Sequence, residues 1–152
     1  MNEAARRNFQ VNYYEKDNDE NTWVVKSHLC DDPHDITVTV EINMPKMEIT
    51  DAHFHFERCP LEQCRLMEKK ASGLIGLKVD KHFSRNMMGV VFGPHGCPNI
   101  MTLLTIAVPG IIYYYYPHLI KKGKMTPEEF WNIMKTEHKT DCLAHTVSFE
   151  KQ

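Results

Sequence analysis

The stretch Ile36-Thr37-Val38-Thr39-Val40-Glu41-Ile42 alternates apolar and polar side chains without a break. Successive side chains of a β-strand point to opposite faces, so this alternation is typical of a strand with one buried and one solvated face. Three further segments of this kind flank it, and they are centred on Phe9–Tyr13, Trp23–Leu29 and Met47–Phe56. The first third of the chain therefore predicts an antiparallel β-meander with one apolar face.

After Pro60 the spacing of apolar residues changes from two to three or four, which indicates helices. The expected helices cover residues 61–71, 80–91 and 98–120, and the inward residues of the second are Phe83, Met87 and Met88. A fourth helix has clear start signals, because Thr126 fits an N-cap, Pro127 the first helical position and Glu129 a capping box.

The end of the chain, residues 143–149, predicts a final strand. Strands followed by helices are the order of an α+β protein. We therefore expect an N-terminal antiparallel β-meander packed on one face by three to four C-terminal helices. The length suits a single domain over residues 1–152.

The composition is that of an ordinary globular protein, with 42% hydrophobic and 25% charged residues. The net charge of −2 gives no basic surface, so we expect no nucleic-acid partner. The five cysteines form no Cys-x-x-Cys pair, and no apolar export segment follows the charged residues 1–7. Reduced thiols in a cytoplasmic protein are therefore favoured over a disulfide framework.

Residues 98–120 contain no Asp, Glu, Lys or Arg, and a segment of that length could span a bilayer. Asn99 and the internal Pro109-Gly110 pair favour instead a buried core helix, kinked or broken near Pro109, and no membrane partner. Tyr113–Tyr116 cannot all face the core of a monomer. Tyrosine suits an interface because it is apolar with a polar tip, so we expect a homodimer, with a ligand pocket as the alternative.

Cys97 lies in the run Phe92-Gly93-Pro94-His95-Gly96-Cys97-Pro98, in which glycine and proline break regular structure. Pro98 suits the first position of a helix because it has no N–H to lose there, which places Cys97 at a helix N-terminus. Free N–H groups and the helix dipole stabilise a thiolate at that point. Cys97 is therefore a candidate nucleophile or ligand, and the nearby His95 is a candidate base or further ligand.

Several segments together resemble a family of small bacterial proteins described only as a domain of unknown function. The matching blocks are Trp23–Leu29 with Asp31, Ile49–Ala52 with Cys64, Leu74–Leu77 with Cys97, and Asp141–Ala144. Many members look like Gly-Cys-Thr-His where this chain has Gly96-Cys97-Pro98-Asn99, so no role of that histidine is carried over. The resemblance implies no established reaction.

A fainter, fold-level similarity is to the U-type iron–sulfur cluster scaffolds, in which an Asp-Ala-x-Phe strand leads to a ligand cysteine. Here that strand is Asp51-Ala52-His53-Phe54, with Cys59 after it. The family-matched residues Asp51, Cys64, Cys97 and Cys142 form a candidate site for zinc or an iron–sulfur cluster, if the fold brings them together. Cys64 also lies on the apolar stripe of its helix, where cysteine is often only a small core residue.

The strand around residues 51–57 carries Asp51, His53, His55 and Glu57 on one face. These side chains fit either a metal-binding histidine pair or the ordinary solvated face of a half-buried sheet. Three functions stay open. They are a cysteine-centred binding site with or without metal, an enzyme that uses Cys97 or a polar pocket on a small acyl or aromatic substrate, and a dimeric structural protein with inert thiols.

Overall fold

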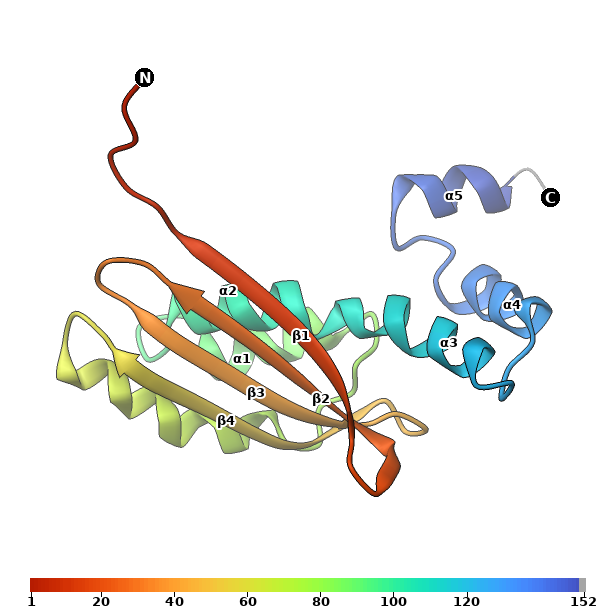
Figure 1. Ribbon diagram of the computed structural model, residues 1–152, viewed down its shortest axis with the longest axis horizontal. Coiled ribbons are helices and arrows are strands. Elements are labelled where there is room, and N and C mark those ends of the chain that lie inside the picture. Colours follow the sequence, from red (N-terminus) through yellow and green to blue (C-terminus); the bar gives the residue numbers. More distant parts are fainter. Residues whose placement is uncertain (151–152) are drawn as a thin grey trace. The chain divides into compact units, whose positions relative to one another are not determined.

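The computed structural model describes residues 1–150, which form two compact units (Figure 1). The first unit comprises Met1–Ile111, and the second begins at Ile112. All the strands belong to the first unit, and so does the loop that carries Cys97. The expectation of a single domain over residues 1–152 stays a prediction.

The first unit is built on an antiparallel sheet whose strands lie side by side in the order of the sequence, which confirms the predicted meander. The strands are β1 (Asn8–Lys16), β2 (Asp19–Cys30), β3 (Asp35–Asn43) and β4 (Glu48–Arg58). In the tight turn between β1 and β2, Asn18 adopts a left-handed φ of 61°. Asparagine tolerates this conformation better than most residues, which explains why a short hairpin forms here.

β3 lies at the centre of the core, and its burial alternates as its sequence does. Ile36, Val38, Val40 and Ile42 are each at most 1% exposed. On β4, residues 51–57 continue the alternation, with the even-numbered side chains buried. The predicted apolar face of the sheet is therefore confirmed on both strands.

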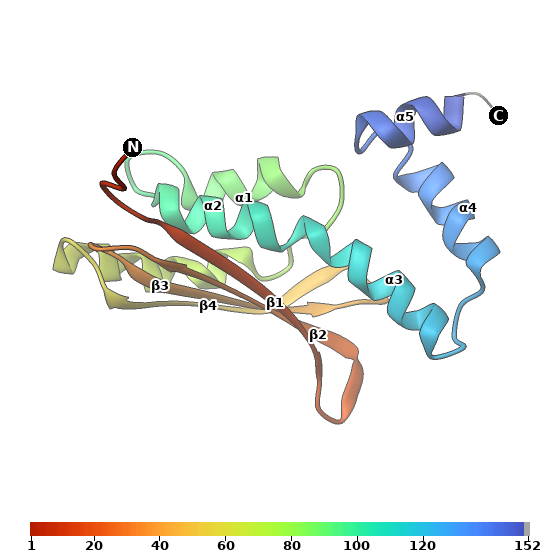
Figure 2. The same ribbon diagram turned by 45° about the horizontal axis from the view of Figure 1, so that its top comes forward.

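Helical segments of the first unit cover this buried face, and its other face stays open within the unit (Figure 2). The segments are the 3₁₀ helix η1 (Glu62–Leu74), α1 (Phe83–Val91) and α2 (Pro98–Ala107). η1 and α2 contact the sheet, and α1 packs against both of them. A meander covered on one face by helices confirms the α+β fold class.

Two details of these helices differ from the sequence prediction. Residues 62–74 form a 3₁₀ helix and not an α-helix. On α1, burial is confined to Phe83, Met87 and Val91, which are four residues apart and share one face. The neighbouring Met88 points away from that face and is 40% exposed, so its predicted inward position is wrong.

η1 also covers the free edge of β4. The backbone N–H of Phe56 donates to Glu68 Oε1 at 3.3 Å, and the Arg65 guanidinium donates to the carbonyl oxygen of Phe56. Near the other end of β4, the N–H of Ile49 donates to the carbonyl oxygen of Leu77 at 3.0 Å. Unpaired edge groups are available to other chains, so these contacts close the edge and fix η1 beside the end of β4.

The apolar run of residues 98–120 is broken at Pro109, as predicted. α2 ends at Ala107 and a single 3₁₀ turn, η2 (Pro109–Ile111), follows. At the break, the Tyr13 hydroxyl donates a hydrogen bond to the carbonyl oxygen of Ala107 at 2.7 Å. By length and composition alone, residues 98–121 are apolar enough to cross a membrane, but 50% of the most apolar part is buried in the protein, as in a core helix.

The second unit consists of α3 (Ile112–Lys121), α4 (Pro127–Glu137) and α5 (Leu143–Glu150). The predicted capping box is present, because the Thr126 hydroxyl accepts from the Glu129 N–H at 3.1 Å and the Glu129 carboxylate accepts from the Thr126 N–H at 2.7 Å. The prediction of a strand over residues 143–149 is wrong. α5 brings the rings of His145 and Phe149 to 5.4 Å, and residues four apart meet in a helix but not in a strand.

Candidate functional site

Cys97 is the N-cap residue of α2, which confirms the position expected from the sequence. Its backbone is extended, with φ −136° and ψ 118°, and Pro98 occupies the first helical turn. The carbonyl oxygen of Cys97 accepts the first hydrogen bond of the helix, from the N–H of Met101 at 3.0 Å. The thiol makes no capping hydrogen bond, so it is available for contacts outside the helix.

Two glycines make the approach to Cys97 possible. Gly93 adopts a left-handed φ of 83°, which ends α1 shortly after Val91. The chain then passes the end of α1 so closely that a Cβ on Gly96 would lie 2.6 Å from the carbonyl carbon of Phe92, and closer still to the Val91 carbonyl. The N–H of Cys97 donates to the Val91 carbonyl oxygen at 2.8 Å, so Cys97 is fixed on the end of α1.

A cleft of about 690 Å³ lies beside Cys97, and the first unit alone forms its walls. The apolar lining residues are Ile36, Phe56, Leu61, Leu66, Met67, Pro94 and Pro98, the polar or reactive ones are His34, Gln63, Cys64, Lys70, His95, Cys97 and Asn99, and Gly96 completes the lining. The fold therefore brings together three residues predicted from the sequence, Cys97, Cys64 and His95. A cleft of this size and mixed lining suits a small organic ligand.

The charges around the cleft favour an electron-rich ligand. Lys70 contributes an ammonium group, and none of the described lining residues is Asp or Glu. Cys97, Pro98 and Asn99 bring the N-terminal turn of α2 to the same cleft. The positive end of a helix dipole attracts carboxylates and carbonyl oxygens, so both features act in the same direction.

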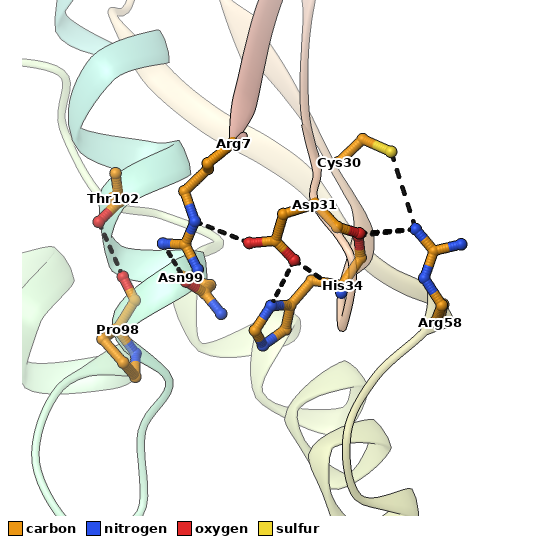
Figure 3. A network of polar contacts seen from close by, with 8 residues as sticks. All are labelled: Arg7, Cys30, Asp31, His34, Arg58, Pro98, Asn99 and Thr102. Atoms are coloured by element: carbon orange, nitrogen blue, oxygen red, sulfur yellow. Dashed lines mark hydrogen bonds and ion pairs between the residues drawn. The ribbon is translucent and has the colours of Figure 1, made fainter. Parts of the chain in front are cut away.

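An Asp–His pair in the β2–β3 turn reaches the cleft through His34 (Figure 3). Asp31 Oδ1 accepts hydrogen bonds from the N–H and from Nδ1 of His34, both at 2.8 Å. Asp31 Oδ2 accepts from Arg7 Nε at 2.7 Å, and Arg7 also donates to Asn99 Oδ1 at 3.3 Å. The side chains of Asp31 and His34 are 7% and 16% exposed, so the pair is held in one arrangement.

The Asp31 carboxyl is ionised at neutral pH although its side chain is only 7% exposed. Burial acts to raise its pKa, but the hydrogen bonds from His34 and Arg7 outweigh this effect and lower the pKa below its ordinary value. Arg58 also binds this turn, since its guanidinium donates to the carbonyl oxygens of Asp31 at 2.7 Å and of His34 at 3.3 Å. The two arginines and the ionised carboxylate therefore fix the turn that carries His34.

Cys64 has a second cysteine beside it. Burial raises the pKa of the Cys59 thiol, the hydrogen bond with Cys64 acts in the same direction, and the charge of Arg65 opposes them. The Cys59 thiol is therefore protonated at neutral pH.

The other two residues of the candidate metal set lie elsewhere. Asp51 is on the open face of the sheet, where its carboxylate accepts from the Ala52 N–H and pairs with His53 Nε2, both at 2.9 Å. Cys142 precedes α5 in the second unit, and its Sγ accepts from the His145 N–H at 3.5 Å. Among the described residues, no group of three or more His, Cys, Asp or Glu side chains could hold a metal ion. The zinc or iron–sulfur site thus has no preformed donor set in residues 1–150 and stays a prediction.

Of the two interpretations offered for the alternating acids and histidines of β4, the structure fits the ordinary solvated face of a half-buried sheet. His53, His55 and Glu57 have side chains that are 72%, 65% and 75% exposed. His55 pairs with Glu57 at 3.3 Å on the same strand, as His53 pairs with Asp51. These pairs are not among the lining residues of the cleft.

Sequence reasoning missed His34 and Lys70. The sequence did contain a signal for His34. In the short run Asp31-Asp32-Pro33-His34, the aspartate side chain can form a hydrogen bond across a turn with the residue three positions later. No local signal existed for Lys70, since its position depends on how η1 runs along β4.

The chain belongs to the family described as "Protein of unknown function (DUF2889)", whose model matches residues 5–111. This confirms the resemblance to a domain of unknown function, and the match contains every lining residue of the cleft. A search of curated proteins and a search of solved structures find no match. The similarity to iron–sulfur scaffolds stays a prediction.

Proposed function

We propose that the first unit of this family member binds a small organic acid or acyl compound with an apolar body, next to Cys97. One observation carries the proposal: Cys97, Cys64 and His95 line a single cleft whose other lining residues are mostly apolar and include Lys70, with no acid among the described lining residues. Ligand sites in proteins commonly combine an apolar wall with a few convergent polar groups.

The apolar wall accounts for the body of the ligand. Ile36 and Phe56 are at most 1% exposed and belong to the rigid core, so they form the fixed floor of the cleft. Leu61 and Leu66 are 64% and 63% exposed, and a ligand in the cleft would remove them from water. Burial of apolar surface contributes roughly 25 cal/mol per Å², so an aliphatic or aromatic body is favoured.

The polar wall accounts for the other end of the ligand. The ammonium group of Lys70 and the N-terminal turn of α2 at Asn99 both attract negative charge. Cys97 lies in the same turn, so its thiol would stand next to a carboxylate or carbonyl group bound there. This arrangement is the reason for preferring an acid or acyl compound over an amine or a sugar.

Calorimetric titration of the full-length protein with sodium octanoate, and with octanamide as the neutral analogue, tests the proposal. Lys70→Met should weaken octanoate binding about fivefold, since an exposed ion pair contributes up to about 1 kcal/mol, and should leave octanamide binding nearly unchanged. Lys69→Met is the matched control, because Lys69 is exposed on the same helix and is not a lining residue.

Bound octanoate should also slow alkylation of Cys97 by iodoacetamide. The proposal fails if millimolar octanoate neither binds nor protects Cys97, or if Lys69→Met weakens binding as much as Lys70→Met does. Anaerobic purification with elemental analysis tests the alternative, a metal-loaded site. One zinc or iron equivalent per chain that requires Cys97 would favour that alternative.

A further inference from the structure

Two of the Asp–His pairs in the first unit differ in where they lie. Asp31 binds Nδ1 of His34 at 2.8 Å, and Asp35 binds Nε2 of His28 at 2.8 Å. His34 lines the cleft together with Cys97. His28 alternates with buried neighbours on β2 and therefore lies on the open face of the sheet. Of these two pairs, only the first belongs to the cleft that Cys97 also lines.

The Asp31 carboxylate determines the state of the His34 ring. An ionised carboxylate can only accept hydrogen bonds, so Nδ1 of His34 carries the hydrogen. In the neutral ring, the lone pair is then on Nε2. Because His34 lines the cleft while its Nδ1 is bound to Asp31, Nε2 is the ring nitrogen left to act on a group in the cleft. A carboxylate that fixes the tautomer and orientation of an imidazole is the arrangement by which histidine activates a nucleophile.

His95 is the less suitable base of the two histidines in the cleft. It lies in the exposed loop between α1 and α2, whereas the His34 side chain is only 16% exposed. The ring of His34 also has a carboxylate beside it that fixes its tautomer and orientation, as in catalytic triads. The geometry thus assigns the base to a residue 63 positions before Cys97 in the chain, since 97 − 34 = 63.

We propose that the first unit catalyses acyl transfer, with Cys97 as nucleophile, His34 as general base and Asp31 as a positioning residue. The proposal rests on the proposed function, because the acyl group would occupy the apolar part of the cleft. Its substrate class is an activated ester or thioester of an apolar carboxylic acid, and its product is the acid itself.

The reaction proceeds in two steps. His34 Nε2 takes the thiol proton of Cys97, the sulfur bonds to the acyl carbon, and the bond from that carbon to the leaving oxygen or sulfur breaks. The leaving group departs with the proton from His34, and the acyl group remains on Cys97 as a thioester. Water then attacks the thioester carbon and gives a proton to His34. The carbon–sulfur bond breaks, and the Cys97 sulfur regains a proton as the acid leaves.

The test mixes the full-length protein with p-nitrophenyl butanoate and follows p-nitrophenolate release together with the mass of the Cys97 peptide. Cys97 should become butanoylated, and Cys97→Ser should abolish that product. His34→Gln should slow acylation about a hundredfold, within the range of general-base catalysis. His28→Gln, in the matched pair outside the cleft, should leave the rate unchanged.

Asp31→Asn tests whether Asp31 positions the His34 ring or only stabilises the fold. An amide can donate to Nδ1 and thereby favour the tautomer with hydrogen on Nε2, so acylation should be slow across the whole pH profile although circular dichroism is unchanged. Asp31→Glu should recover part of the rate. If Asp31→Asn unfolds the protein, the assignment of the base still depends on His34→Gln.

Absence of butanoylated Cys97 in the wild type overturns the inference, and so does a His34→Gln rate equal to that of the wild type. A larger loss in His95→Gln than in His34→Gln assigns the base to His95 and also overturns it. In each of these cases, octanoate binding and protection of Cys97 would leave the proposed function standing. Loss of binding as well would remove both.

Discussion

Replacing Gly96 with alanine should displace Cys97 and destabilise the first unit. The new Cβ would lie 2.6 Å from the carbonyl carbon of Phe92 and closer still to the Val91 carbonyl, and side chains do not adopt such distances to backbone atoms. Either the loop or the end of α1 must therefore move. That movement separates the Cys97 N–H from the Val91 carbonyl oxygen, which lie 2.8 Å apart in the native structure.

The expected loss of stability is the sum of two effects. Overpacking against fixed atoms costs about 1–3 kcal/mol. The lost hydrogen bond contributes about 1 kcal/mol. Gly96→Ala should therefore lower the free energy of unfolding by roughly 2–4 kcal/mol. Gly89→Ala is the matched control, because Gly89 is exposed on α1 and its Cβ would meet nothing within 4 Å. Alanine is the better helix former by about 1 kcal/mol, so this variant should be more stable than the wild type.

Urea unfolding followed by tryptophan fluorescence measures both variants. A Trp131→Phe background leaves Trp23, which is 5% exposed in the core of the first unit, as the reporter. The rate of iodoacetamide labelling of Cys97 gives a second readout, because displacement from the α2 N-terminus should change it. Equal unfolding free energies for Gly96→Ala and Gly89→Ala, together with unchanged labelling, would refute the described path of the loop.

Three further predictions concern other parts of the chain. Tyr13→Phe should cost about 1 kcal/mol in urea unfolding, because it removes the hydrogen bond to the Ala107 carbonyl. The pKa of Asp31 is lower in the folded than in the unfolded protein. Its ionised carboxylate therefore stabilises the fold fully above the unfolded-state pKa, and this stabilisation is lost as the pH falls through the folded-state pKa. Asp31→Asn should therefore be less stable than the wild type at pH 7, and the gap in urea midpoints should shrink on acidification; a constant gap contradicts this. Tyr113 and Tyr114 are 51% and 54% exposed, so if they form the predicted dimer interface, the double glutamate variant should sediment as a monomer where the wild type is a dimer. A monomeric wild type at high micromolar concentration contradicts the dimer.

The sheet was predictable because its cause is local. Residues 36–42 alternate since one face of β3 is buried, and the buried members are each at most 1% exposed. The same reasoning fails at residues 143–149, where the apolar side chains fit either period. There the ring contact between His145 and Phe149 requires a helix. Such a ring contact depends on how the two side chains meet in the folded chain, and the spacing of apolar residues in the sequence does not reveal it.

Only part of the candidate site was predictable, and for a similar reason. Cys97 at a helix N-terminus follows from Pro98 and the glycines next to it in the sequence. The presence of Cys64 and Cys97 in one cleft does not follow from any local pattern, because it depends on η1 lying along the edge of β4. His34 enters the cleft only because the β2–β3 turn lies at the same end of the sheet as the start of α2, which is a property of the whole unit.

Arg7 provides the physical link between these two parts of the site. Its guanidinium donates to Asp31, on the turn that holds His34, and to Asn99, on the helix that starts at Cys97. One side chain from the segment before β1 therefore relates the position of the imidazole to that of the thiol. The family match begins at residue 5 and ends at residue 111, so it includes Arg7 and the whole cleft and excludes Cys142. The cleft with its Asp31–His34 pair therefore lies wholly within the part of the chain that the family model matches, whereas a site that includes Cys142 extends beyond it.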